Sequence, residues 1–481
     1  MSGRDTSQLS VSREALVGLG GKMLQAALGF AGVLFLTRAL GSDGLGRYRT
    51  VTAAAFVVVQ FSEGIGSAIK KRVSEVETAP PAFLTFGLAV HAGVSVLTLV
   101  VLLLVRPFAV SYFGTFELAV GVVLVTGTLG LFTVLSGYLS GIGYPARSTW
   151  FDTVRSVATL AGQVGLILWG LDSFGAVAGL AVGTVVTAGL VWLSIRAPLV
   201  VPTADVARRT LSFARHEVPT NLLSNFYTSA DPLLIRLFAG ASGVGYFTLA
   251  AQLVMPASMF ASSISNPLSV RSSGVDSVGR DVRPDLVNAV AYTGLLAIPI
   301  FFGAVAIGEA LLTSGVFGKS FQSAPGALLA GLALYQVSNS YRTPMEAALH
   351  GIDRPETVFR VNLGVTVAYV PAAVGLGSVY GAVGVVAGTV LAETLRVITY
   401  QFVARRRFGG VVTPRPVFEQ IAAGVVMFGV VEYLAGVLAI GRPLPLLGTI
   451  GVGGVVYFLS LVFLSGHFRR TARRTLGQFL E

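Results

Sequence analysis

The chain has 481 residues, of which 53% are hydrophobic and only 12% are charged, and it contains no cysteine. Soluble domains carry about 25% charged residues, so this composition indicates an integral membrane protein and excludes a disordered chain or a disulfide scaffold. The lack of cysteine also excludes thiolate nucleophiles, iron–sulfur clusters and cysteine-based zinc sites. The formal net charge of +11 comes from basic residues at the ends of apolar runs, which is typical of membrane proteins and argues against a nucleic-acid partner.

Long apolar runs recur along the whole chain. A helix that crosses a bilayer needs about 20 mostly apolar residues. Residues 1–13 are polar and lack the cleavage site of a signal peptide, so the first apolar run is taken as the first span. The fourteen predicted spans are residues 15–39, 48–69, 82–105, 117–140, 148–171, 174–195, 217–239, 244–267, 286–312, 325–348, 357–378, 381–404, 416–439 and 444–466.

The basic residues between these spans predict the orientation. Arginine and lysine flanking a span stay on the cytoplasmic side. Arg13, Lys70, Arg208, Arg283 and Arg405 all fall on one side of the predicted spans. Because the number of spans is even, both termini are predicted to be cytoplasmic in a multi-pass plasma-membrane protein. The connecting loops are too short for a soluble catalytic domain, so no enzymatic activity, metal or cofactor is expected.

Three short motifs each occur twice, about 200 residues apart. The spacing maps six spans onto six spans in the same orientation, which is a parallel repeat of the kind found in two-lobed transporters. The pairs are GSDGLG at 41–46 and GASGVG at 240–245, SGIGYP at 140–145 and HGIDRP at 350–355, and GAVAGLAVGTVV at 175–186 and GAVGVVAGTVL at 381–391.

The repeat predicts the division of the chain. Residues 1–196 would form a first lobe and residues 217–410 a second lobe, joined by a cytoplasmic linker at 197–216. Residues 411–481 would add two further spans and a basic cytoplasmic tail. The predicted fold is therefore all-α, with two parallel six-helix lobes followed by two C-terminal helices.

Polar side chains within the spans predict a hydrated cavity. A charged side chain in the bilayer costs about 2.5–3.5 kcal/mol on insertion scales, so it faces a cavity or a partner. In spans one and two these residues share one helix face, and spans seven and eight repeat the pattern. The predicted cavity residues are Lys22, Gln25, Gln60, Glu63, Asn221, Asn225, Thr228, Asp231 and Gln252.

Four charged residues in spans ten and twelve leave two interpretations open. Arg342 and Glu346 are four residues apart, and Glu393 and Arg396 are three apart. Both spacings suit an ion pair on one helix, so each pair either forms a structural contact within its lobe or lines the cavity.

Three other polar residues are expected to have structural positions. Asp152 and Arg155 lie near the inner end of span five and are expected at the membrane interface. His91 stands alone in an apolar span, where a histidine with satisfied hydrogen bonds is more common than a proton relay.

Two stretches of this sequence resemble the polysaccharide-biosynthesis flippases of the multidrug/oligosaccharidyl-lipid/polysaccharide (MOP) superfamily. The first is TRALGSDGLGRY at 37–48 with EGIG at 63–66. The second is SFARHEVP at 212–219, followed by Asp231 and GVGYFTLA at 243–250. The resemblance extends over all fourteen predicted spans. It implies a transporter that moves a lipid-linked oligosaccharide from the inner to the outer leaflet by alternating access, without ATP hydrolysis.

The resemblance also implies roles for some cavity residues. Related flippases hold the phosphate of the carrier lipid with basic cavity residues, and Lys22 is the best match to that role. Amides and hydroxyls of spans seven and eight would contact sugar hydroxyls. Glu63 and Asp231 are candidates for binding a coupling H⁺ or Na⁺. The remaining expected partners are membrane lipids, and the protein is expected to be a monomer.

Two other functions fit the sequence less well. A cation-coupled multidrug exporter of the same superfamily would have a mainly acidic, aromatic-lined cavity, which Lys22 argues against. A membrane glycosyltransferase, polymerase or ligase would need catalytic groups or a metal in sizeable outer loops, and the predicted outer loops are short.

Overall fold

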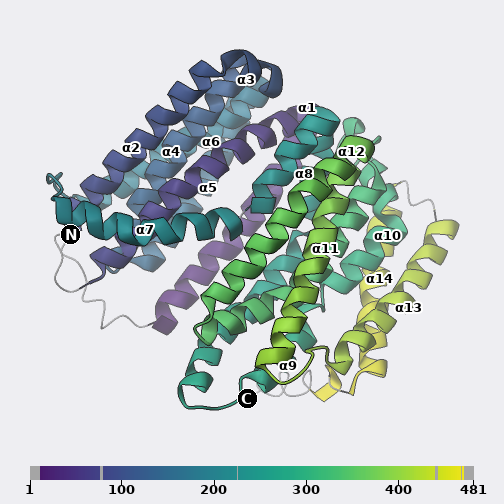
Figure 1. Ribbon diagram of the computed structural model, residues 1–481. Helices are drawn as coiled ribbons and strands as arrows, with labels where there is room; N and C mark the ends of the chain where they lie inside the picture. The colour runs from purple at the N-terminus through teal and green to yellow at the C-terminus, as the bar shows by residue number, and fades with distance from the viewer. Residues whose placement is uncertain (1–10, 76–79, 225, 439–441, 467, 471–481) are drawn as a thin grey trace. The chain divides into compact units, whose positions relative to one another are not determined.

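The computed structural model describes residues 11–75, 80–224, 226–438, 442–466 and 468–470, and these residues form helices and short connections without any strand (Figure 1). The chain divides into two compact units, residues 1–245 and 246–481. Unit 1 contains α1 (Val11–Val73), α2 (Pro80–Leu104), α3 (Arg106–Phe113), α4 (Phe116–Gly141), α5 (Pro145–Leu166), α6 (Asp172–Ile195), α7 (Ala204–Ser224) and the first part of α8 (Phe226–Ser277). Unit 2 contains the rest of α8 and α9 (Arg283–Thr293), α10 (Ala297–Thr313), α11 (Gly326–Gly351), α12 (Pro355–Arg407), α13 (Arg415–Val437) and α14 (Pro443–Leu464).

Within the described part of the chain, nine helices are long and apolar enough to cross a membrane. Four of them have between 49 and 53 residues, so each would be about 75 Å long if it were straight, more than twice the thickness of the hydrocarbon core. These four are α1, α5 and α6 counted together (Pro145–Ile195), α8 and α12. Each contains a glycine with a positive φ, at Gly41, Gly170, Gly240 or Gly381. Glycine adopts a positive φ without steric cost, and each of these breaks lies beside a turn between two predicted spans.

Each of the four long helices can therefore account for two predicted spans. The all-helical, multi-pass fold is confirmed, while the total of fourteen spans stays a prediction. Helix α11, which carries Arg342 and Glu346, is not among the nine helices found by length and apolar composition.

One hydrophobic core of unit 1 joins α1, α2, α4, α6 and α7. Ile69, Leu84, Leu135 and Val191 are at most 1% exposed in this core. Helix α2 packs beside α4, and α4 packs beside α6 (Figure 1). Burial of these side chains ties the helices of unit 1 together through non-directional apolar contact.

Helix α7 occupies much of the predicted linker at 197–216, because residues from 204 onward are helical. Val206, Thr210 and Ala214 recur every four residues and are all buried. Val206 and Ala214 belong to the core of unit 1. The segment is therefore an amphipathic helix that packs on α1 and α2 (Figure 1), a pattern that its polar residues concealed. The predicted lobe boundaries at 196 and 217 remain a prediction.

Unit 2 has a core between α10, α13 and α14. Ile298, Met427 and Tyr457 are buried there, and α13 packs against both α10 and α14 (Figure 1). On the other side of unit 2, α10 contacts α11 and α11 contacts α12. The two C-terminal helices are thus attached to unit 2 through α10.

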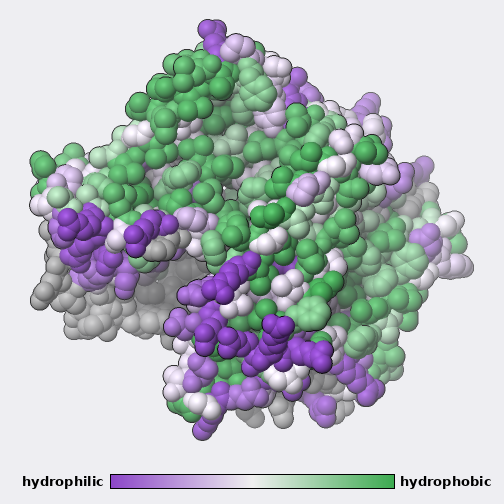
Figure 2. Space-filling view, in the orientation of Figure 1, coloured by the Kyte–Doolittle hydropathy of each residue, from purple (hydrophilic) through white to green (hydrophobic). Residues whose placement is uncertain are grey.

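Large apolar side chains also cover the surface of both units. Leu104 is 78% exposed, Trp169 is 81% exposed and Leu444 is 84% exposed. Figure 2 shows continuous hydrophobic surface over the helix sides and hydrophilic surface gathered near α7 and near α9. Apolar patches of this extent are not stable in water, so these helix sides face the hydrocarbon of the bilayer.

Candidate functional site

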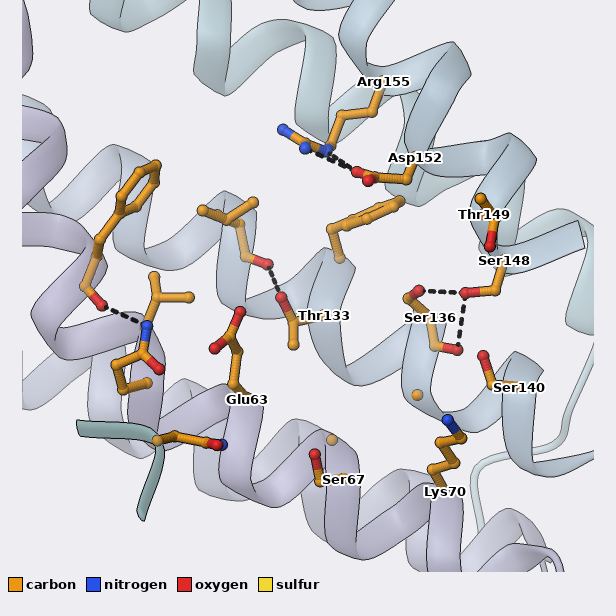
Figure 3. A pocket seen from close by; sticks show the side chains of 18 of the residues that line it. Glu63, Ser67, Lys70, Thr133, Ser136, Ser140, Ser148, Thr149, Asp152 and Arg155 are labelled. Atoms are coloured by element: carbon orange, nitrogen blue, oxygen red, sulfur yellow. Dashed lines mark hydrogen bonds and ion pairs between the residues drawn. The ribbon is translucent and has the colours of Figure 1, made fainter. Parts of the chain in front are cut away.

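A hydrophilic cavity of about 630 Å³ lies inside unit 1. Its walls come from α1, α4 and α5, with Asn221 contributed by α7. The lining is dominated by hydroxyl, amide and charged side chains, several of which are labelled in Figure 3. Polar groups in a membrane-spanning bundle are expensive unless they are hydrated or paired, so this cavity is a water-accessible space within the helices.

One face of α1 supplies the longest wall of the cavity. Gln60, Glu63, Ser67 and Lys70 line it at intervals of three or four residues, which places them on the same side of a helix. Glu63 points toward Thr133 of α4 (Figure 3). Lys70 is exposed at one end of the cavity, and within the described residues no carboxylate lies at ion-pair distance from it.

The opposite wall holds a fixed ion pair on α5. Arg155 Nε donates to Asp152 Oδ1 at 2.8 Å, and the guanidinium of Arg155 lies 5.3 Å from the ring centre of Phe132. Gln25 Nε2 donates to Asp152 Oδ2 at 2.7 Å. Both oxygens of Asp152 accept hydrogen bonds, and the one from Gln25 ties α1 to α5.

Hydroxyl groups join α4 to α5 at the same level. The Oγ atoms of Ser136 and Ser148 are 2.6 Å apart and form a hydrogen bond, and Ser148 Oγ also donates to the carbonyl of Ser136 at 3.4 Å. Ser140 and Thr149 complete this side of the lining (Figure 3). Hydroxyls both donate and accept, so this wall can exchange its internal hydrogen bonds for contacts with a polyhydroxylated molecule.

The formal charges of the described lining residues balance. Two carboxylates, Glu63 and Asp152, face two cations, Lys70 and Arg155. The aromatic residues of the lining are Phe56 and Phe132. Such a cavity suits a polar, hydroxyl-rich ligand that carries an anionic group, and its described lining residues are neither mainly acidic nor mainly aromatic.

The structure brings together four of the nine predicted cavity residues. Gln25, Gln60, Glu63 and Asn221 all line this cavity. Asp231 is only 3% exposed and is not part of the lining.

The remaining predicted cavity residues are not among the described lining of this cavity. Gln252 belongs to unit 2. Lys22 and Thr228 lie in helices, but their side chains are outside the described part of the structure, as is the whole of Asn225. The assignment of phosphate binding to Lys22 therefore remains a prediction.

Several lining residues were not identified from the sequence. Asp152 and Arg155 both line the cavity, and their expected position at the membrane interface stays a prediction. Ser136, Ser140 and Lys70 were not selected at all. Ser136 and Ser140 are four residues apart, on a side of span four that is rich in small residues. This spacing could have identified the two serines, because serine among small residues often forms contacts between membrane helices.

The charged residues of spans ten and twelve form a separate network in unit 2. Arg342 pairs with Glu346 on α11, and Arg342 Nε donates to Glu393 Oε1 of α12 at 2.6 Å. Arg396 Nη1 lies 3.3 Å from Glu393 Oε2, and Asn362 Nδ2 donates to Glu346 Oε1 at 3.1 Å. Both sequence-spaced ion pairs are present in the structure, and the link between Arg342 and Glu393 joins them across two helices. None of these residues lines the cavity of unit 1.

His91 is a buried residue with satisfied hydrogen bonds. Its Nε2 lies 2.8 Å from the carbonyl oxygen of Gly127, and its Nδ1 lies 3.0 Å from Ser62 Oγ. Because a carbonyl oxygen can only accept, Nε2 carries a hydrogen, and Nδ1 of the neutral ring accepts from the serine hydroxyl. This arrangement is the structural role expected from the sequence.

The sequence is similar to a known protein family and to a flippase. A family model described as "Polysaccharide biosynthesis protein" matches residues 11–271. AglR of Haloferax volcanii, described as a probable flippase, is 23% identical to this chain, and the similarity covers 98% of this chain and 99% of AglR.

Two solved structures share the fold. The lipid II flippase MurJ, in an inward closed conformation, superposes with a TM-score of 0.77 at 17% identity, covering 93% of this chain and 98% of MurJ. An inward-facing multidrug-resistance transporter of the MATE family, also in the MOP superfamily, gives a TM-score of 0.63 at 17% identity, covering 82% of this chain and 98% of that transporter.

Proposed function

The chain belongs to the polysaccharide biosynthesis protein family, and from this membership and the site geometry we propose that it is a flippase. Its substrate is a lipid-linked oligosaccharide, a precursor of a polysaccharide or a glycoprotein glycan, and it moves this substrate from the inner to the outer leaflet by alternating access. The observation that carries the proposal is the hydrophilic, charge-balanced cavity within the helices of unit 1.

The proposal follows from the cost of moving a glycan through hydrocarbon. Each hydroxyl or charged group that enters the bilayer without a partner costs several kcal/mol. The cavity replaces water with the hydroxyls of Ser136, Ser140 and Thr149 and the amides of Gln60 and Asn221. The lipid tail remains in the bilayer while the head group uses this path.

The phosphate of the carrier requires a cation. Of the two described cations of the lining, Arg155 is held by Asp152, so Lys70 is the residue available for a phosphate at the end of the cavity. Lys22, one helix segment earlier on α1, is the second candidate. Both lysines are predicted to lie in the cytoplasmic half of the membrane, where the loaded carrier would first enter.

The direction of transport depends on the orientation and on an energy source. We propose that both termini are cytoplasmic, on the basis of the arginine and lysine distribution, and that the protein acts as a monomer. Glu63, which faces the cavity, is the proposed binding group for a coupling H⁺ or Na⁺. A membrane potential would contribute about 2.3 kcal/mol per charge per 100 mV to such a step.

A cation-coupled multidrug exporter is the second candidate, because the MATE transporter shares the fold. The cavity favours the flippase, since among its described lining residues two carboxylates are matched by two cations and aromatic residues are few. A drug-resistance assay separates the two functions. Overexpression that raises resistance to cationic dyes, with no effect on glycan delivery, would favour the exporter.

The decisive experiment measures the leaflet in which the lipid-linked glycan resides. In inverted vesicles from cells that lack the protein, the glycan should remain accessible to a glycosidase or lectin added on the cytoplasmic side. Restoring the intact chain should make it inaccessible. Equal accessibility with and without the protein would rule out the flippase function.

A further inference from the structure

A second cavity in unit 1, of about 670 Å³, lies between α1, α2 and α7. Its wall is mainly apolar, with Ile65 of α1, Val90 and Val94 of α2, and Val218 of α7. Phe61 and Leu211 also line it and are 44% and 49% exposed. Exposed apolar side chains at the rim of a membrane-protein cavity suit an opening toward lipid.

This cavity is separate from the hydrophilic one, because the two lie on different sides of α1. Residues 61, 62 and 65 face the apolar cavity, whereas residues 60, 63 and 67 face the hydrophilic cavity. At 3.6 residues per turn, these two sets point in nearly opposite directions. A molecule in the apolar cavity therefore has the whole of α1 between it and the proposed glycan path.

Two arginines of α7 supply positive charge to the apolar cavity. Arg208 and Arg215 both line it, both are exposed, and neither has an ion-pair partner among the described residues. Their neighbour Arg209 behaves differently, because its Nη2 lies 2.7 Å from Glu75 Oε2 and its guanidinium lies 5.9 Å from the ring centre of Phe83. Arg209 holds α7 on the core, while Arg208 and Arg215 present free charge beside an apolar slot.

The position along α1 places the cavity at one surface of the bilayer. Ser62 and Ile65 precede Lys70 by eight and five residues, so they lie about 12 and 8 Å from it along the helix axis. The basic end at Lys70, Lys71 and Arg72 marks the level of the head groups. A lipid with its head group at α7 would therefore place its chain beside Ile65.

We propose that this cavity binds one anionic phospholipid of the resident bilayer, with its phosphate at Arg208 and Arg215 and an acyl chain in the apolar slot. Basic pockets between membrane helices on the cytoplasmic side commonly bind such head groups. The carrier lipid of the substrate fits less well, because its attached glycan would be on the wrong side of α1 from the hydrophilic cavity. The bound lipid would brace α7 against α1 and α2.

The test measures lipid binding to the purified, delipidated chain by native mass spectrometry, without any glycan substrate. The probes are dioleoyl phosphatidylglycerol and dioleoyl phosphatidylcholine. We expect one phosphatidylglycerol to bind at least tenfold more tightly than phosphatidylcholine. The double variant Arg208→Gln/Arg215→Gln should lose this preference, and the double variant Arg405→Gln/Arg406→Gln, which changes exposed arginines at the end of α12, should retain it.

A second variant keeps the result interpretable if the double variant does not fold. Leu211→Trp would fill the slot without changing charge and should also displace the bound lipid, whereas Leu103→Trp, on the exposed side of α2, should not. Equal phosphatidylglycerol binding by wild type and both cavity variants would overturn the proposal. Displacement of phosphatidylglycerol by an equimolar amount of dolichyl phosphate would also overturn it, because the carrier lipid would then be the occupant. These measurements do not depend on whether the protein is a flippase.

Discussion

Ser62 and Glu63 are neighbours on α1, yet they line two different cavities of unit 1. Ser62 lies beside the apolar cavity and forms a hydrogen bond with His91 of α2, whereas Glu63 faces α4 across the hydrophilic cavity (Figure 3). Helix α1 therefore separates the hydrophilic cavity from the apolar cavity. Substitutions one residue apart on α1 should consequently affect different properties of the protein.

Glu63→Gln tests the carboxylate of the hydrophilic cavity. The amide keeps the size of the side chain and removes its charge, so the fold should be preserved. A hydrogen bond to a charged group contributes roughly 1.5–3 kcal/mol, so we expect transport to fall about tenfold or more. The measurement is the rate at which lipid-linked glycan becomes protected in vesicles, at matched protein levels.

The control for this variant is Glu356→Gln. Glu356 is 84% exposed and forms a loose surface pair with Arg360 at 3.4 Å, so its change should leave transport unaltered. Equal transport by the two variants would show that the charge of Glu63 has no part in the cycle.

Lys70→Ala tests the proposed phosphate contact. Removing the ammonium group should weaken binding of the diphosphate or phosphate head group by about tenfold, given roughly 1.5–3 kcal/mol for a charge-assisted contact. Lys71→Ala is the matched control, because Lys71 is adjacent and also exposed but does not line the cavity. The effect should decrease at high ionic strength, because salt screens exposed charges.

The same assay should include Lys22→Ala. The resemblance to flippases implies Lys22 as the phosphate ligand, whereas Lys70 is a described residue of the cavity lining. Wild-type affinity in Lys70→Ala, together with a loss in Lys22→Ala, would transfer the role to Lys22. A loss in both variants would indicate that the two lysines bind the head group together or in succession.

Much of the fold could be predicted because the bilayer restricts the choice of structure. Every backbone polar group must be satisfied within the membrane, so long apolar runs had to become helices. The repeated motifs at 41–46 and 240–245 correctly marked two sharp breaks, at Gly41 and Gly240. Helix α7 was not expected, because its apolar residues are few and its amphipathic pattern is short.

The cavity was harder to predict than the fold. The periodicity of α1 correctly placed Gln60 and Glu63 on one face, since that depends only on spacing along one helix. It could not show that Gln25 meets Asp152, because these residues are 127 positions apart. Which helix a polar residue faces is decided by packing between helices, and one sequence contains no direct record of that packing.

Arg342→Ala tests the charge network of unit 2. Glu393 is 1% exposed and the side chain of Arg342 is 14% exposed, so removal of the arginine leaves two carboxylates without their main cation. Breaking a buried pair in this way typically costs about 3–5 kcal/mol. We expect a lower thermal unfolding midpoint in detergent or a clear loss of folded protein.

Arg360→Ala is the control for the network. Arg360 is 79% exposed in its pair with Glu356, and exposed pairs contribute about 0–1 kcal/mol. Its unfolding midpoint should stay close to that of the wild type. Equal midpoints for Arg342→Ala and Arg360→Ala would mean that the network adds no stability, and a role in transport would then have to be considered.

Gly46→Ala tests a reciprocal contact between the two copies of the repeated motif. A Cβ at Gly46 would overlap the carbonyl oxygen of Ala241, and a Cβ at Gly245 would overlap the carbonyl oxygen of Ser42. Positions 42 and 46 of the first motif correspond to 241 and 245 of the second. The two turns therefore pack on each other by the same contact in both directions, and neither glycine can gain a methyl group unless the helices separate.

Alanine normally stabilises a helix relative to glycine by about 1 kcal/mol. A loss of protein stability in these two alanine variants would therefore come from the close contact and not from helix propensity. Gly46→Ala and Gly245→Ala should each lower the unfolding midpoint and the yield of folded protein. Gly189→Ala, in α6, is the control because nothing lies within 4 Å of its added Cβ, and it should be neutral or stabilising. If Gly46→Ala unfolds at the same temperature as Gly189→Ala, the close approach of the two turns does not contribute to the stability of unit 1.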